Sequence, residues 1–474
     1  MNKKCVEAVR TDKRGLFVNS WYEELQPSFK KRTGELALVD LAGLSDEGLR
    51  GHIASAVNLY AEAGNAHFKL VFAMALPLYR FSSFCESSLG WKRGRILEML
   101  GSARTSEPSR RLEELVKEAS GNRKVMSLLE TRSEKGVFED LRTADPGLAD
   151  ALSAYLREYC CLTVGYDVSM PSIDEDPFLI VKLIHEGTRP TMGRSPSGEA
   201  SRKRHELIEE ARTLIDAKGW DEREKFDRLL RDADRVYGAI DDTQFYLMRC
   251  RGVVRKGLLE MGRRLAERKV LAMPEDVFFL EIGEAQEAFR GARTGLSELV
   301  RERKGRRTWA EAHPGPKSYG KPPGPPPSMK SFPQEVREVT ESFLWMFENV
   351  GLGPKEKKAG VLSGLGASSG SYTGPVRLVR DESEFRKVRP FDVLVCPTTA
   401  PTWTVLFANV GALVTDMGGL LSHPAIIARE YRIPAVLATT NATQMLHDDQ
   451  IVTVDGDAGT VEVQTPASAG GGMG

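Results

Sequence analysis

The sequence lacks an excess of either charge. Its 474 residues include 66 Lys and Arg against 66 Asp and Glu, so the formal net charge is zero. A protein that binds a polyanion over a wide surface usually carries a strong positive charge, so nucleic acid is not expected as a partner. Any phosphate chemistry in this chain must therefore be local.

The sequence also lacks a long hydrophobic run. Residues 1–15 have no apolar core of the kind that a signal peptide needs. The longest apolar run, Leu70–Tyr79, is about half of the ~20 residues that a membrane-spanning helix requires. These absences predict a cytoplasmic protein with no membrane partner.

Cysteine is scarce and scattered. The six residues are Cys5, Cys85, Cys160, Cys161, Cys250 and Cys396. They form no CxxC pair and have no neighbouring histidine, so the sequence indicates neither a zinc site nor a disulfide framework. We expect reduced, mostly buried thiols and no metal site.

The remaining composition is that of a globular protein, with 41% hydrophobic and 28% charged residues and enough length for several domains. Residues 40–350 are dominated by helical periodicity. Residues 222–238 carry apolar side chains on one face, which predicts an amphipathic helix that stops at Gly238. A second helix is predicted from about Thr243 to Lys269. We therefore expect a mostly α-helical body.

Two breaks in the pattern predict connecting segments. Residues 314–333 are rich in proline, which is incompatible with a helix or a central strand. After a predicted helix at 334–349, residues 351–374 are rich in Gly, Ser and Lys and have the composition of a hinge. We divide the chain into a helical substrate-binding domain (1–312), a linker (313–361), a histidine-bearing domain (362–465) and a disordered tail (466–474).

Beyond the hinge, short β-branched runs replace the long helices. The predicted strands are 376–379, 393–396, 412–414, 435–437, 451–454 and 460–463. A single helix, 424–430, is predicted among them. The fold class is thus multidomain, with a helical body followed by a small α/β domain.

The most informative stretch is TDMGGLLSHPAIIARE at 415–430. Gly418 and Gly419 permit a tight turn, Ser422 is a favoured cap, and His423 is thereby presented where a helix begins. A helix N-terminus stabilises a phosphate and disfavours a protonated imidazole, which leaves a ring nitrogen free as a nucleophile. The alternative is a structural or solvent-exposed histidine, which is the commoner outcome for a lone His.

This stretch resembles the phosphohistidine swivelling domain of the phosphoenolpyruvate-utilising enzymes, which include phosphoenolpyruvate synthase and rifampicin phosphotransferase. The similarity continues through residues 397–407, 412–443 and 448–463, in the order and spacing of that family. It implies that His423 accepts a phosphoryl group and carries it between distant sites. The residues assigned to the histidine loop beside it are Thr415, Gly418, Gly419, Ser422 and Arg429. Pro424 departs from the Ala or Gly of many members, but proline is tolerated in a first helical turn.

The helical part is similar to the substrate-binding portion of rifampicin phosphotransferases, over residues 34–50, 245–265 and 274–284. Family members that use ATP carry an ATP-grasp domain before this portion, and the similarity here begins too early to leave room for one. No Walker-type loop replaces it. The resemblance therefore implies that ATP and Mg²⁺ bind a separate ATP-grasp subunit, as in phenylphosphate synthase, whose parts are separate subunits.

Candidates on the acceptor side are His67, Tyr246, Arg249 and Arg251, with His67 a candidate general base. Each also has a structural alternative, because a helical arginine is usually solvated and a tyrosine is often part of a core. Glu275 and Asp276 are expected to cap a helix or turn.

Three functions remain open at this point. The first is a phosphotransferase subunit that delivers phosphate from His423 to the hydroxyl of a small, apolar organic acceptor such as a phenol. The second is an ATP-dependent condensing or ligase subunit that uses the same histidine. The third is a catalytically silent binding protein, which would not need to retain both the histidine and the glycine turn.

Overall fold

The computed structural model describes residues 13–101, 107–131, 136–159, 161–163, 165, 167–173, 175, 177–188, 196–292, 295–313, 315, 320, 332–349, 361–399, 403, 406–407 and 409–464. Most of the proline-rich stretch 314–333, residues 351–360 of the predicted hinge, and the predicted tail 466–474 lie outside the described residues.

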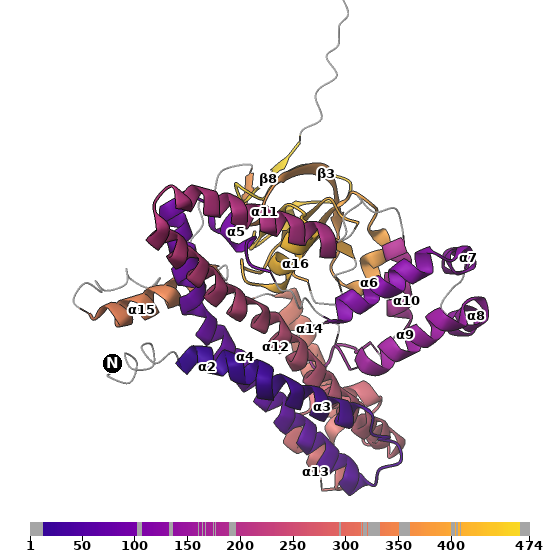
Figure 1. Cartoon of the computed structure of the whole chain (residues 1–474). Coiled ribbons are helices and arrows are strands. Elements are labelled where there is room, and N and C mark those ends of the chain that lie inside the picture. Colours follow the sequence, from indigo (N-terminus) through magenta and orange to yellow (C-terminus); the bar gives the residue numbers. More distant parts are fainter. Residues whose placement is uncertain are drawn as a thin grey trace, which may run out of the picture.

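The first part of the chain is helical, as predicted, and we call it the helical body. Its elements are α2 (Lys13–Ser20), η1 (Trp21–Leu25), α3 (Gln26–Ala37), α4 (Asp46–Leu89), α5 (Arg93–Leu97), α6 (Glu107–Ser120), α7 (Arg123–Thr131), α8 (Val137–Ala144), α9 (Pro146–Tyr159), α10 (Phe178–Thr188), α11 (Pro196–Asp216), α12 (Trp220–Glu267), η2 (Pro274–Phe279), α13 (Ile282–Phe289), α14 (Leu296–Ala312) and α15 (Gln334–Phe347). The long helices α4 and α12 run side by side, and α6 to α10 form a group on one flank (Figure 1).

Helix α4 has strong end signals. Ser45 precedes it and accepts a hydrogen bond from the Gly48 amide at 3.1 Å, while Asp46 and Glu47 lie in the first turn, where the helix dipole favours acids. The helix ends at Gly90, whose φ of +68° favours glycine. By length and composition alone α4 would also pass for a membrane span, but 56% of its most apolar window is buried. A core helix meets the same criteria, so this is weak evidence for a membrane.

Helix α12 corrects one sequence prediction. The predicted stop at Gly238 is wrong, because a single helix runs from Trp220 to Glu267 and joins the two predicted helices. A glycine inside a helix costs only about 1 kcal/mol relative to alanine. The buried face of α12, packed along α4, outweighs that cost.

The C-terminal part is a small α/β unit, which we call the histidine module. Its elements are β1 (Val361–Ser363), β2 (Leu365–Ser368), β3 (Ser371–Leu378), η4 (Glu382–Lys387), β4 (Val393–Cys396), β5 (Ala412–Thr415), α16 (His423–Tyr431), β6 (Ala435–Leu437), α17 (Ala442–Met445), β7 (Ile451–Asp455) and β8 (Thr460–Val463). Within the described residues the strands form one mixed sheet in the order β1-β8-β7-β3-β4-β5-β6-β2. Strands β3, β4, β5 and β6 are parallel neighbours.

All six predicted strands are confirmed, as are the helices predicted at 334–349 and 424–430. The prediction of a hinge is wrong for residues 361–374, most of which belong to β1, β2 and β3. Strand β2 pairs with β6, and β1 pairs with β8, so neighbouring strands supply the order that Gly- and Ser-rich composition does not reveal.

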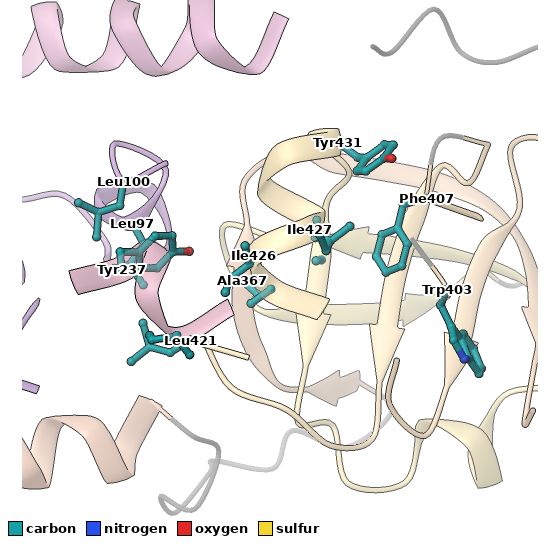
Figure 2. Packing of buried hydrophobic residues seen from close by; sticks show 14 of the residues in the cluster. Leu97, Leu100, Tyr237, Ala367, Trp403, Phe407, Leu421, Ile426, Ile427 and Tyr431 are labelled. Carbon is teal, nitrogen blue, oxygen red and sulfur yellow. The ribbon is translucent and has the colours of Figure 1, made fainter. Parts of the chain in front are cut away.

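Buried apolar residues form a core within each part, and one cluster joins the two parts. That cluster includes Leu97 and Tyr237 of the body together with Ala367, Leu421 and Ile426 of the module (Figure 2). The module is therefore packed against the body rather than separated from it.

The described cysteines confirm the expectation of buried thiols. Cys85, Cys161, Cys250 and Cys396 are buried, and none of these four forms a disulfide within the described residues. Burial raises the pKa of the Cys250 thiol to about 12, so this thiol is neutral at physiological pH. Cys5 and Cys160 lie outside the described residues.

Candidate functional site

The histidine loop, residues 415–422, begins at Thr415, the last residue of β5. The Thr415 hydroxyl donates a hydrogen bond to the Met417 carbonyl at 2.6 Å. The Thr415 carbonyl accepts two hydrogen bonds from Thr439, one from its amide at 3.0 Å and one from its hydroxyl at 2.9 Å. Because Thr439 follows the neighbouring strand β6, the start of the loop is tied to the sheet.

Glycines then turn the chain, as predicted. Gly418 has a φ of +118°, which side-chain-bearing residues rarely adopt, and a Cβ at this position would lie 3.1 Å from Ser422 Oγ. Ser422 Oγ accepts a hydrogen bond from the Gly419 amide at 3.1 Å and donates one to the Gly419 carbonyl at 2.7 Å. The prediction that the Ser422 side chain caps the helix is thus wrong, because the hydroxyl closes the loop instead.

His423 is the first residue of α16, as the sequence predicts. The preceding Ser422 carbonyl accepts the amides of Ala425 and Ile426 at 3.0 and 3.1 Å, which starts the helix. Pro424 falls in the first turn, where the missing N–H removes no helical hydrogen bond. His423 is only 6% exposed. The nucleophile candidate is therefore covered in this arrangement of the two parts.

Arg429 lies two turns further along α16 and is also buried. Its Nη2 donates to the Leu420 carbonyl at 2.7 Å, and its Nη1 donates to the Ala367 carbonyl of β2 at 2.8 Å. Nη2 also donates to the Tyr237 hydroxyl of the helical body at 2.5 Å. The guanidinium group therefore holds the histidine loop, the sheet edge and the body together.

Three residues of this region were not singled out from the sequence. Asp416 accepts hydrogen bonds from the amide and hydroxyl of Thr443. The Asn349 carbonyl, just after α15, accepts the Leu420 amide at 2.7 Å. The third is Tyr237, which accepts the hydrogen bond from Arg429. Asp416 lies inside the motif and could have been found there, whereas nothing in the sequence around Tyr237 or Asn349 indicates a role at this site.

On the acceptor side, His67 of α4 contacts Thr243 of α12, with 2.9 Å between Nδ1 and Oγ1. The Thr243 hydroxyl donates its proton to the Ile240 carbonyl, so Nδ1 must be the donor to Oγ1. That assignment leaves Nε2 as the basic nitrogen. Burial lowers the pKa of His67, which keeps the ring neutral near pH 7. These are the properties of a general base.

The other three candidates do not share one environment. Tyr246 packs in an aromatic cluster with Trp21, Phe29 and Phe245. Arg249 is buried beside α3, and its Nε has no hydrogen-bond partner among the described residues.

Arg251 contacts different residues from Arg249. Its Nη1 donates to the Gly165 carbonyl at 3.0 Å, and its guanidinium lies over the Tyr60 ring. These contacts are those of a residue that holds the body together. Asp276 accepts the amides of Ala272 and Met273, which confirms the predicted capping role.

No group of three or more His, Cys, Asp or Glu side chains in the described residues is arranged to hold a metal ion. The side chains in the part of the chain that the structure describes therefore do not fit a Mg²⁺ site.

Comparison with known proteins identifies two domains. Residues 388–459 match the PEP-utilising enzyme mobile domain, and residues 67–240 match the rifampicin phosphotransferase fourth domain. The first match contains the histidine loop, and the second contains the part of α4 from residue 67 onward and the part of α12 up to residue 240, which includes Tyr237.

Three relatives extend the comparison. The uncharacterized phosphotransferase YvkC of Bacillus subtilis (strain 168) is 31% identical over 412 residues, which cover 85% of this chain and 48% of the relative. A rifampicin phosphotransferase of Streptomyces sp is 29% identical over 356 residues, covering 72% of this chain and 37% of the relative. A probable phosphoenolpyruvate synthase of Archaeoglobus fulgidus is 44% identical over 101 residues, covering 21% and 13%.

The chain spans about half or less of the length of these curated relatives. The domain matches nevertheless agree with the fold and with the position of the histidine loop. The chain therefore joins a domain similar to the PEP-utilising enzyme mobile domain to a helical domain similar to the fourth domain of rifampicin phosphotransferase.

Proposed function

We propose that this chain is a phosphotransferase in which His423 accepts a phosphoryl group and passes it to the hydroxyl of a small, apolar organic acceptor. The observation that carries the proposal is the placement of His423 at the first residue of α16, after a glycine turn that Ser422 and Arg429 hold closed. A helix start stabilises the negative charge of a bound phosphate. The names of the relatives support the same reaction class.

The reaction consists of two displacements at phosphorus. In the first, an imidazole nitrogen of His423, by family resemblance the distal Nε2, forms an N–P bond as a P–O bond of ATP breaks. In the second, the acceptor oxygen forms a P–O bond as the N–P bond breaks, and the hydroxyl proton passes to a base on the body. His67 is our candidate for that base, because its Nε2 is the unprotonated nitrogen.

We further propose that ATP and Mg²⁺ are held by a separate ATP-grasp subunit. Neither matched domain is described as nucleotide-binding, and the described residues offer no metal-ligand cluster. A covered His423 cannot reach a nucleotide on another protein. The histidine module must therefore leave the body for phosphorylation and return for transfer.

The test is phosphate incorporation at His423. Wild type, His423→Ala and the matched control His447→Ala are incubated with a candidate ATP-grasp protein and MgATP, and their intact masses are compared at alkaline pH, where phosphohistidine persists. We expect one phosphoryl group on the wild type and on His447→Ala, and none on His423→Ala. Equal incorporation in all three proteins would refute the assignment.

Product analysis then separates phosphotransfer from ligation. Wild type charged with phosphate is mixed with a panel of small alcohols and phenols. A phosphate ester is the product expected of a phosphotransferase, whereas the condensing alternative gives a joined product without a stable ester. A protein that takes no phosphate from any candidate partner would favour the silent binding alternative.

A further inference from the structure

The histidine module and the helical body share a specific interface. At its apolar centre, Leu97 and Tyr237 of the body lie next to Ala367, Leu421 and Ile426 of the module (Figure 2). All five side chains are buried. Helix α11 of the body also packs against α16, the helix that begins with His423.

Polar contacts surround this apolar centre. Glu113 accepts a hydrogen bond from the Tyr431 hydroxyl at 2.8 Å, and Glu98 accepts the Ser369 amide at 2.8 Å. Lys92 donates to the Asp457 carbonyl at 2.8 Å. Each of these contacts joins a residue of the body to one of the module, so they fix a single docked orientation.

Two contacts lead directly to the histidine loop. The first is the hydrogen bond from the Leu420 amide to the Asn349 carbonyl after α15, and the second runs through Arg429. Arg429 Nη2 donates to both the Tyr237 hydroxyl of the body and the Leu420 carbonyl of the loop. Leu420 is three residues before His423. The same guanidinium group therefore contacts the body and holds the loop, so a movement of the body relative to the module changes the contacts of the loop.

Removing the Tyr237 hydroxyl would leave a charged donor buried without that acceptor. Tyr237 is 2% exposed and Arg429 is 8% exposed, so water has little access to replace the lost bond while the two parts remain together. Hydrogen bonds to charged groups are among the stronger ones in proteins, and an unsatisfied buried donor is costly. Undocking, which exposes Arg429 to water, becomes more favourable as a result.

We propose that Tyr237 is a positioning residue that holds the histidine module on the helical body by accepting a hydrogen bond from Arg429, and that Arg429 transmits the docked position to the histidine loop. The docked state covers His423, and opening of the Tyr237–Arg429 contact uncovers it. The relevance to catalysis rests on the proposed function of His423, whereas the docking itself does not.

The test measures how fast His423 is labelled by diethyl pyrocarbonate in the full chain, with each histidine followed by peptide mass spectrometry. A covered histidine is labelled only through opening, so the rate follows the opening equilibrium. We expect Tyr237→Phe to label His423 about tenfold faster than wild type, with His52 and His67 unchanged. Tyr155→Phe is the matched control, because Tyr155 is a buried tyrosine whose ring packs at a tilt against Tyr159 within the body.

A double-mutant cycle with Arg429→Lys makes the test specific to the pair. If the two residues act through one contact, the double variant is labelled no faster than Arg429→Lys alone. Independent, multiplicative effects would overturn the proposal, as would a wild-type labelling rate in Tyr237→Phe or an equal increase in Tyr155→Phe. The labelling uses neither ATP nor acceptor, so it tests the docking contact even if the proposed phosphotransfer is wrong.

Discussion

A glycine at the interface allows docking to be weakened without touching the histidine loop. Gly94 lies in α5 and faces the Gly366 carbonyl of β2 in the module. A Cβ at residue 94 would lie 2.8 Å from that carbonyl oxygen, whereas ordinary contact begins at 3.4 Å. The substitution Gly94→Ala must therefore separate the two backbones by about 0.6 Å, because neither is the end of a flexible side chain.

The expected cost can be stated from typical overpacking energies. Adding a methyl group to a filled site costs about 1–3 kcal/mol, which corresponds to roughly a 5- to 150-fold shift of the docking equilibrium. Alanine also favours the helix by up to about 1 kcal/mol over glycine, in the docked and undocked states alike. The body should thus keep its stability while the module docks more weakly.

Labelling of His423 by diethyl pyrocarbonate measures the docking, and thermal unfolding measures the stability. Gly305→Ala is the matched control, because this exposed glycine of α14 has no atom within 4 Å of the added Cβ. We expect faster labelling of His423 in Gly94→Ala and a wild-type rate in Gly305→Ala. An unchanged rate in a folded Gly94→Ala would show that the close contact of Gly94 with Gly366 does not limit docking, and the argument would fail.

Two further predictions concern the candidate base His67 and the loop residue Ser422. Burial lowers the pKa of His67 in the folded protein, so its contribution to stability is complete above the unfolded pKa of about 6.5 and is lost as the pH falls from that value through the lower folded pKa. Urea titrations at pH 7.5 and 5.5 should therefore show a larger loss of stability on acidification for the wild type than for His67→Asn, and equal losses would contradict the assignment. Ser422→Ala removes both hydrogen bonds to Gly419, so it should slow phosphorylation of His423 about tenfold and lower the free energy of unfolding by about 1–2 kcal/mol. Ser422→Thr keeps the hydroxyl and is the control. A wild-type rate of phosphorylation in Ser422→Ala would show that closure of the loop is not required.

Local patterns in the sequence predicted the elements that local forces determine. The β-branched runs of β4 and β5 give strands, and the glycines, serine and proline around His423 give a turn followed by a helix. Each of these features depends on residues within a few positions of one another. The turn of the histidine loop and the helix start after it were therefore predictable, whereas the roles of the Ser422 hydroxyl and of Asp416 were not.

The features that the sequence did not predict depend on distant partners. Gly238 is a local stop signal, but packing of α12 along α4 carries the helix through it. Strand β2 has a weak strand composition and is ordered by β6, about 70 residues later. The contact between Tyr237 and Arg429 joins residues 192 positions apart. A single sequence contains no pairing information of this kind.

The interface places opposing demands on the strength of docking. Under the proposed function, transfer to an acceptor on the body would require the docked state, whereas loading from a separate subunit would require His423, which is covered here, to be uncovered. If docking were very tight, the partner would meet an accessible histidine only rarely, and its apparent affinity would fall by the undocked fraction. An interface of moderate strength satisfies both demands. The interface combines an apolar centre with hydrogen bonds that water can replace once the parts separate, and Tyr237 contacts Arg429, which also binds the histidine loop. A change at Tyr237 is therefore expected to alter both the docking strength and the position of the loop.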